Sequence, residues 1–243
     1  MVNIDTVYQT VLALANKEQR GYVTPQEFNL FANQAQVEIF EQYFYDLNQF
    51  LRVPGNQSEY SDMINILEEK IGFFKNIASL TYDDVNKVFI LPNDLYRLGT
   101  IFHGGIEQNQ SLTSQNIVEE VDEKELSYLN RDFDSVSKLL TPRQERPIYT
   151  KRKNTIKVYP TSLQQNVRCS YVKNPNNAMW GYVVVNEKAM WNPSASQHFE
   201  LHPAERTELV YKILKYAGIS IKQEDIMMAG QGMEMAKVTQ EKQ

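Results

Sequence analysis

Two histidines and a glutamate alternate in the segment HFELH, residues 198–202. Imidazole and carboxylate groups are ordinary ligands of catalytic zinc, which activates a water molecule for hydrolysis. The helical zinc-protease pattern needs its glutamate directly after the first histidine, and Pro203 disfavours helical backbone at His202. In an extended segment, however, His198, Glu200 and His202 would point to one side. The sequence therefore leaves two readings open: a metal-dependent hydrolase centred on these three residues, or a structural segment that leads into a helix.

A second segment, NKEQRGYVTPQEF at residues 16–28, resembles the loop of a calcium-binding EF-hand in its spacing. Arg20 then occupies a position that should donate an oxygen ligand, and its guanidinium would bring a permanent positive charge to the cation. We therefore expect no calcium site. Thr24, Pro25 and Glu27 instead have the order of a capping box with proline at the first helical position. They predict the start of a helix.

Positive charge is concentrated in one part of an otherwise acidic chain. The residues are Lys151, Arg152 and Lys153, with Arg143, Arg146 and Lys157 close by in the sequence. Such a cluster favours contact with phosphates or with an acidic protein neighbour. A short run of charge at a turn is also typical of a solvated hairpin tip. Both interpretations stand, and Lys151, Arg152 and Lys153 are candidate interaction residues.

Patterns of the common enzyme classes are absent from the sequence. No phosphate-binding loop, dinucleotide fingerprint or nucleophile elbow occurs, and the glycines at 230 and 232 lack the strand and helix that a phosphate cradle needs. Cys169 lies in an alternating strand pattern, which predicts a packed thiol rather than a nucleophile. The 30 acidic residues single out no catalytic pair. We therefore expect a protein without enzymatic activity and without a cofactor.

Length and composition indicate a folded protein. At 243 residues and 42% hydrophobic content, the chain has enough apolar surface for one elongated domain or two small ones. A net charge of −5 argues against a general nucleic-acid binder, which needs a basic surface. With a single cysteine and no signal-peptide pattern, folding in a reducing cytoplasm is expected. No membrane span is expected, because the apolar runs are short.

The first part of the chain, residues 1–86, is predicted to be a helical segment. Apolar residues recur at helical spacing in residues 4–15, after Pro25, and in residues 60–74. The stripe after Pro25 is wide and aromatic, and such a stripe faces a core. Its members are Phe28, Phe31, Ala35, Ile39 and Tyr43, widened by Leu30, Val37, Phe40 and Phe44.

Residues 87–202 are predicted to be β-rich. The segment PIYTKRKNTIKVYP, residues 147–160, indicates a hairpin with its turn near Lys153 and Asn154. A partner strand is expected to follow it through Val167, Cys169 and Tyr171, and a further strand at residues 183–185. The sequence thus predicts an α+β fold: an antiparallel sheet with helices on both sides of it in the chain.

Residues 203–243 are predicted to hold a last helix and a tail, within one elongated domain. Pro203 opens the helix and Gly218 is expected to end it. The tail beyond Gly218 combines apolar residues with glycines and a polar end, which disfavours an autonomous fold. We expect it to be mobile in the free protein and to become ordered on docking. Its candidate interaction residues are Ile226, Met227, Met228, Met233 and Met235.

Several segments together resemble the head–tail connector, or adaptor, proteins of short-tailed bacteriophages, most closely the ring proteins of crAss-like phages. The resemblance lies in the amino-acid sequences of these segments and in their order, since no catalytic or metal motif defines the family. They are NKEQRGYVTPQEFNLFANQAQVEIFEQYF, FILPNDLYRL, IYTKRKNTIKVYPTS, VRCSYVKNP and WGYVVVNEKAMWNPSASQHFELHPAERTELVYKILKYAGISI. They cover most of the chain and are weakest between residues 104 and 144.

The resemblance implies a structural protein of the virion, located at the head–tail junction and made in the bacterial host cytoplasm. It implies a homo-oligomeric ring, commonly of twelve copies, beneath the portal protein and above further ring or tail proteins. Genomic DNA would pass through the ring without sequence-specific binding, which suits an acidic chain. A cyclic ring needs two different complementary surfaces on each copy. The 14 tyrosines and 11 phenylalanines are residues that anchor such interfaces.

Overall fold

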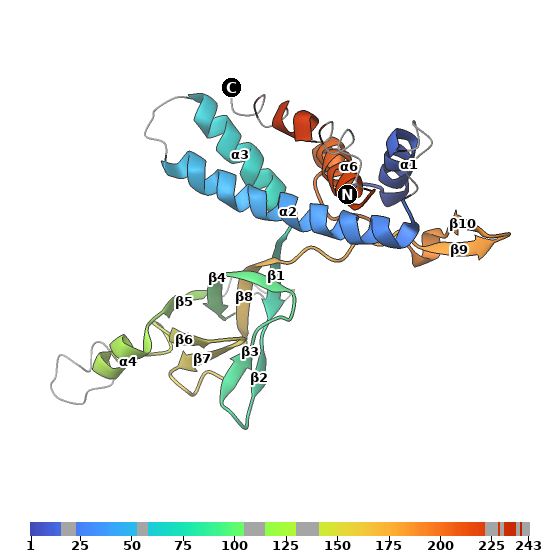
Figure 1. Cartoon of the computed structure of the whole chain (residues 1–243). Coiled ribbons are helices and arrows are strands. Elements are labelled where there is room, and N and C mark those ends of the chain that lie inside the picture. Colours follow the sequence, from blue (N-terminus) through green and yellow to red (C-terminus); the bar gives the residue numbers. More distant parts are fainter. Residues whose placement is uncertain are drawn as a thin grey trace. The chain divides into compact units, whose positions relative to one another are not determined.

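The computed structural model describes residues 1–15, 23–52, 58–104, 115–129, 141–221, 228, 231–236 and 239. The chain forms two compact units, Met1–Phe73 with Pro175–Gln243, and Phe74–Asn174. The first unit is mainly helical and the second consists mainly of strands (Figure 1). The predicted α+β class is therefore confirmed. The predicted divisions at residues 86 and 202 differ from the unit boundaries, because the chain leaves the helical unit after Phe73 and re-enters it at Pro175.

The helical unit is built from α1 (Ile4–Ala15), α2 (Pro25–Arg52), α3 (Ser58–Gly72) and α6 (Arg206–Ile221). Helix α2 packs against both α3 and α6, and α1 packs against α6. The predicted stripe of α2 is confirmed at its centre, where Phe28, Ala35 and Ile39 are buried. Its predicted width is confirmed at Phe40, which is buried, and is wrong at Leu30 and Val37, which are 71% and 40% exposed. The unit covers only one side of the helix.

Helix α2 begins with the predicted capping box. The Thr24 amide donates to Glu27 Oε2 (3.0 Å), and the Glu27 amide donates to Thr24 Oγ1 (3.2 Å). The backbone hydrogen bond from Thr24, followed by that of its hydroxyl, lowers the pKa of the Glu27 carboxyl. Glu27 therefore serves as a helix cap, as predicted. Residues 16–22 of the segment that resembles an EF-hand lie outside the described residues.

Replacement of Thr24 by alanine should lower the free energy of unfolding by about 1 kcal/mol, because one helix N-terminal amide loses its acceptor. Thr24→Ser keeps the hydroxyl and should stay close to wild type. Urea unfolding of the three proteins, with calcium and with a chelator, measures both effects. A saturable rise in the unfolding midpoint at micromolar calcium would contradict the capping role and favour a cation site.

The strand unit contains one eight-stranded sheet in the order β1-β8-β4-β5-β6-β7-β3-β2. Its two edge strands, β1 (Lys75–Ser79) and β2 (Thr81–Asp83), are separated in the chain by Leu80 alone. The two edges of the sheet must therefore lie next to each other, and the Leu80 amide donates to the carbonyl of Val167 (2.9 Å). The sheet curls around its own core, as strands in small barrels do. The other strands are β3 (Val88–Ile90), β4 (Leu95–His103), β5 (Asn116–Glu120), β6 (Ile148–Arg152), β7 (Thr155–Tyr159) and β8 (Val167–Lys173).

The pairing of the strands differs from the prediction in two respects. The hairpin β6–β7 is confirmed, with Lys153 at φ 48° in its turn. Strand β8, however, pairs with β1 and β4 and not with the hairpin. Strands β5 and β6 are parallel, so the sheet is mixed rather than antiparallel. Parallel neighbours need a long crossover. Residues 121–147 separate β5 from β6 in the chain, and their described part includes helix α4 (Glu123–Leu129).

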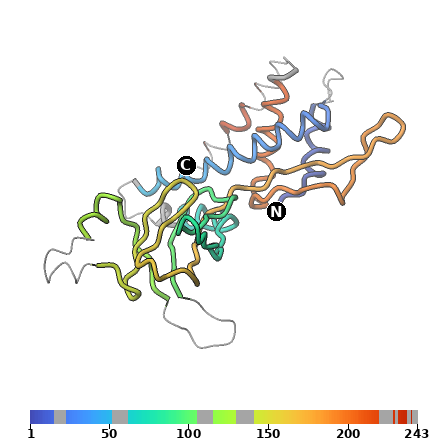
Figure 2. The backbone as a smooth tube through the Cα atoms, turned by 90° about the horizontal axis from the view of Figure 1, so that it is seen from below, coloured from blue at the N-terminus to red at the C-terminus, as the bar shows by residue number. Residues whose placement is uncertain are grey.

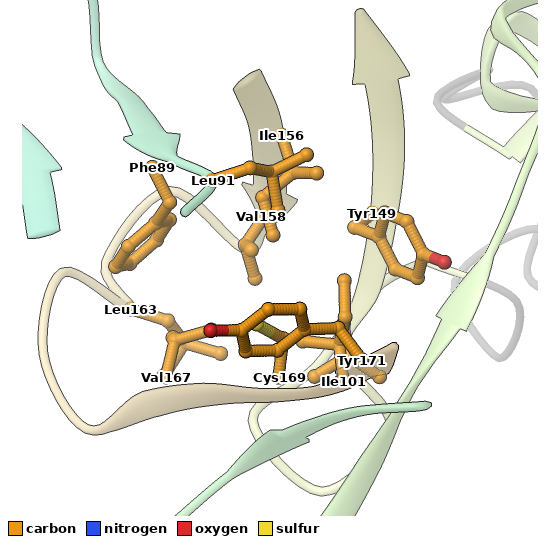
Figure 3. Close-up of a cluster of buried hydrophobic side chains, with 11 residues drawn as sticks. Phe89, Leu91, Ile101, Tyr149, Ile156, Val158, Leu163, Val167, Cys169 and Tyr171 are labelled. Atoms are coloured by element: carbon orange, nitrogen blue, oxygen red, sulfur yellow. The ribbon is translucent and has the colours of Figure 1, made fainter. Parts of the chain in front are cut away.

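The core of the strand unit is apolar and enclosed by the curled sheet (Figure 3). Cys169 lies within it without exposure to solvent, and burial raises the pKa of its thiol. The predicted packed thiol is therefore confirmed. The cluster consists of Phe89, Leu91, Ile101, Val118, Tyr149, Ile156, Val158, Leu163, Val167, Cys169 and Tyr171.

The helical unit has a two-stranded sheet of its own, formed by β9 (Tyr182–Val185) and β10 (Lys188–Trp191). Two short 3-10 helices follow, η2 (Pro193–Ala195) and η3 (Pro203–Glu205), and His202 caps the second. The predicted end of the last helix at Gly218 is wrong, because α6 continues to Ile221. Among the helices of the described residues, none combines the length and apolarity that a bilayer span requires.

Candidate interaction surfaces

A ladder of side-chain amides joins helix α2 to an extended segment at residues 176–180. Asn33 accepts from the Ala178 amide (2.8 Å) and donates to the Ala178 carbonyl (2.9 Å). Asn29 makes the same pair of bonds with the backbone of Trp180, at 2.7 and 3.3 Å. Gln36 donates to the Asn176 carbonyl (2.7 Å). These amide side chains lie three and four residues apart on one face of α2. They make the backbone hydrogen bonds that a neighbouring strand would otherwise make, and they fix the segment that leads into β9.

Trp180 anchors this segment in the core of the helical unit. Its side chain is 2% exposed, and its indole Nε1 donates to Asp5 Oδ1 at 3.0 Å. The ring centroid lies 4.1 Å from that of Tyr8 on α1 and 5.9 Å from that of Tyr182 on β9. Helix α1, helix α2 and the start of β9 therefore meet at one buried tryptophan.

Ser196 closes the base of the β9–β10 hairpin. Its hydroxyl accepts from the Gly181 amide (3.0 Å) and from Trp191 Nε1 (2.9 Å), and it donates to the Asn192 carbonyl (2.7 Å). A Cβ atom at Gly181 would lie 2.6 Å from the backbone of Ala195, so only glycine fits there. The two strands consequently leave the unit in a fixed direction.

The β9–β10 hairpin itself is apolar and exposed, and we call residues 182–191 the arm. Asn186 and Glu187 have φ values of 49° and 63°, as a two-residue hairpin turn requires. Figures 1 and 2 both show the arm extending away from the helices of its unit. The strand predicted at residues 183–185 is confirmed, but a continuous apolar run is typical of a buried strand, and this one is exposed. Its exposed members are Val183, Val184, Val185, Met190 and Trp191, with exposed fractions between 38% and 62%.

The His198, Glu200 and His202 side chains make three separate sets of contacts. His198 Nδ1 accepts from the Ile4 amide (3.3 Å), and His202 Nδ1 accepts from the Ala204 amide (3.2 Å). Buried Glu200 accepts from the amide and from the side chain of Asn176, at 3.0 and 2.9 Å. Within the described part of the chain, no three His, Cys, Asp or Glu side chains gather as a metal site would need. These contacts give the three residues structural roles, and none of them favours the hydrolase hypothesis.

The basic cluster is partly neutralised by neighbouring carboxylates. Arg152 pairs with Glu123 (2.5 Å) and Arg146 pairs with Glu119 (3.1 Å), both at the surface. Lys151 and Lys153 are exposed in and beside the β6–β7 turn. The structure therefore places all three candidate residues, Lys151, Arg152 and Lys153, at a solvated hairpin tip. Surface ion pairs of this kind contribute little stability.

The C-terminal candidate residues are only partly described. Met228, Met233 and Met235 are 63%, 43% and 69% exposed, whereas Ile226 and Met227 lie outside the described residues. Residues 231–236 are helical. Glu234 in this segment contacts Lys212 (2.6 Å) and Lys215 (3.2 Å) of α6. The tail thus has an ionic attachment to its own unit that leaves its methionines at the surface.

Lys212 is the centre of this attachment. It is 4% exposed, and it also pairs with Glu38 of α2 (3.1 Å) and Glu208 (3.8 Å). Burial alone would lower the pKa of Lys212, but its hydrogen bond to Glu234 and the charges of Glu38 and Glu234 raise it. Burial and a hydrogen bond to Glu38 raise the pKa of the neighbouring Tyr216 hydroxyl. Our sequence analysis missed this cluster, and its only local signal is the i,i+4 pair of Glu208 with Lys212.

A comparison of the chain with protein-family models and with curated protein sequences finds no match. The resemblance to connector proteins therefore rests on the amino-acid sequences and the order of the segments given above. The structure adds the surfaces just described.

Proposed function

We propose that this protein is a structural component of a virion. In this proposal it forms a head-to-tail connector ring beneath the portal and lines the channel through which DNA is ejected. The observation that carries the proposal is the arm: an exposed, apolar hairpin that an amide ladder, a buried tryptophan and a required glycine hold in one direction. Exposed apolar surface on a rigid support is typical of a protein–protein contact. A connector needs such contacts and no chemistry.

The charge distribution supports the same function. The net charge is −5, and Arg146 and Arg152 are engaged with Glu119 and Glu123. DNA binding is driven by neutralisation of phosphates, so an acidic ring would let the genome pass without holding it. The proposed partners are other copies of this chain, commonly twelve, the portal protein and further ring or tail proteins.

The tail is the proposed contact to the portal. Met228, Met233 and Met235 present flexible apolar side chains at the surface, and methionine adapts to irregular grooves. The ionic attachment of Glu234 to Lys212 keeps this segment close to α6. In this proposal the tail becomes fully ordered only on docking, when new burial offsets the ordering entropy.

Electron microscopy of purified virions tests the function directly. We expect a cyclic ring of this protein between capsid and tail, with the protein made in the bacterial cytoplasm beforehand. Quantitative mass spectrometry should give a copy number equal to that of the ring. Detection of the protein in infected cells but not in purified virions would refute the connector proposal.

A further inference from the structure

We propose that the arm of one copy packs on the outer face of helix α2 of the next copy. The inference rests on the proposed ring and names the contact by which neighbouring copies meet. The occupant of the arm is thus a second molecule of this chain, bound in a head-to-tail manner.

The arm exposes both unpaired strand edges and apolar side chains. Its two strands pair only with each other among the described residues, so both outer edges keep unpaired backbone groups. Val184 is 62% exposed and Met190 57%. Isolated two-stranded ribbons are marginally stable in water, and exposed apolar edges promote association. The contacts of Gly181 and Ser196 at the base nevertheless hold this ribbon in place.

Helix α2 offers a second exposed apolar surface in the same unit. Leu30, Val37 and Leu51 are 71%, 40% and 63% exposed. Their spacings of about seven and fourteen residues put them on one side of a helix. Tyr45 is 63% exposed and lies about 80° from Val37 around the helix axis, so it widens this surface. We call these four residues the α2 outer stripe.

The charges of the two surfaces favour a second copy as partner. Copies with a net charge of −5 repel one another, so contact is least costly through uncharged surfaces. The arm carries only Glu187 and Lys188, both at its tip. Between Val37 and Tyr45, α2 carries Glu38, which pairs with Lys212, and Glu41. Lys188 is complementary to Glu41. A phosphate-bearing partner would find no cluster of basic side chains on the arm.

The exposed apolar areas of the arm and the α2 outer stripe fit a weak contact between two different surfaces. Closure of a ring would stabilise such a contact. Five large apolar side chains are exposed on the arm and four on the α2 outer stripe, and the largest apolar patch of an ordinary monomer is roughly 300–600 Å². A stable binary interface needs roughly 800 Å² per partner, so one arm on one helix is a weak contact. Each copy has both surfaces and therefore takes part in two contacts. A contact between two different surfaces builds a ring where the rotation between copies closes and an open filament where it does not, whereas a two-fold dimer uses one surface twice.

Cysteine cross-linking tests the contact, since native Cys169 is buried and does not interfere. We expect the double variant Val37→Cys/Val184→Cys of the full chain to give a ladder of dimers, trimers and larger species with a short bismaleimide. Each single variant should give no covalent ladder on a denaturing gel, because a head-to-tail contact brings two different positions together. The matched control is Val85→Cys/Val184→Cys, since Val85 is 88% exposed and belongs to the strand unit.

The variant Val184→Lys gives a second measurement. It should weaken self-association in sedimentation at least tenfold and leave the unfolding midpoint unchanged, because the side chain is 62% exposed. A ladder no stronger than that of the Val85 control overturns the inference, as does unchanged association of Val184→Lys. Binding of the arm to phospholipid vesicles without a ladder would also overturn it and assign the arm to a membrane.

The two proposals fail in different ways. Presence in the virion ring without Val37–Val184 cross-links would leave the connector function in place and remove the arm contact. A ladder formed by a protein that is absent from virions would keep the arm contact and remove the connector function.

Discussion

Replacement of Lys212 by alanine is expected to lower the free energy of unfolding by about 3 kcal/mol, the size of effect seen when one partner of a buried ion pair is removed. The variant would leave Glu38, Glu208 and Glu234 facing one another without their shared cation. Lys212 is 4% exposed, so water cannot take its place without rearrangement of α2, α6 and the tail.

The matched control is Lys215→Ala. Lys215 is one helical turn away, is more exposed and pairs only with Glu234 among the contacts described above, so its loss should cost about 1 kcal/mol or less. Urea unfolding at neutral pH measures both variants. A Lys212 effect no larger than the Lys215 effect would show that the cluster is solvated and adds little stability.

The pH dependence of this cluster follows from two opposite pKa shifts. Burial opposes ionisation of Glu234, but Lys212 lowers its pKa below the ordinary value of 4.5. The contribution of Glu234 to the free energy of unfolding is therefore complete above pH 4.5 and is lost as the pH falls through its folded-state pKa. The pKa of Lys212 is raised above 10.5, so its contribution is complete below pH 10.5 and is lost as the pH rises further.

Wild type and Lys212→Ala should consequently differ by a constant amount between about pH 5 and pH 10 and converge outside this range. Glu38, Glu208, Lys215 and Tyr216 also face the cluster, and the raised pKa of Tyr216 keeps its hydroxyl protonated across the range. Unfolding curves at a series of pH values measure the difference. Convergence at pH 7 would contradict the assignment of Lys212 as the central cation.

Replacement of Trp180 by alanine should lower the free energy of unfolding by about 4 kcal/mol, a usual value for the loss of a large buried aromatic side chain. The indole fills the space between α1, α2 and the base of the arm, and its loss also leaves Asp5 without its Nε1 donor. We further expect the arm to lose its fixed direction, since Trp180 and Gly181 directly precede β9.

The second tryptophan is a matched control in the same unit. Trp191 is 38% exposed and lies on the arm, so Trp191→Ala should cost about 1 kcal/mol. It should instead weaken self-association, because it removes apolar surface that the neighbouring copy would cover. Urea unfolding and sedimentation of both variants separate the two effects. Equal losses of stability in the two variants would show that Trp180 does not anchor the unit.

Local features of this protein are predictable from the sequence, because neighbouring residues contain both partners. The capping box depends on Thr24 and Glu27, three residues apart. The hairpin β6–β7 depends on two alternating segments joined by a tight turn. The buried centre of α2 follows from helical periodicity alone. Prediction ends where an element needs a partner that lies far away in the chain.

Tertiary structure alone decides which apolar residues are buried and which strands are neighbours. Asn29 and Asn33 reach backbone groups about 150 residues further along the chain, and no local pattern distinguishes them from solvated amides. The exposure of Val37 and Val184 depends on what the fold leaves uncovered, since valine has the same local preference in a core as on an interface. The helices, the β6–β7 turn and the Thr24 capping box could therefore be derived from the sequence, although the end of α6 could not. The candidate contact surfaces could not, because burial depends on the arrangement of the whole unit.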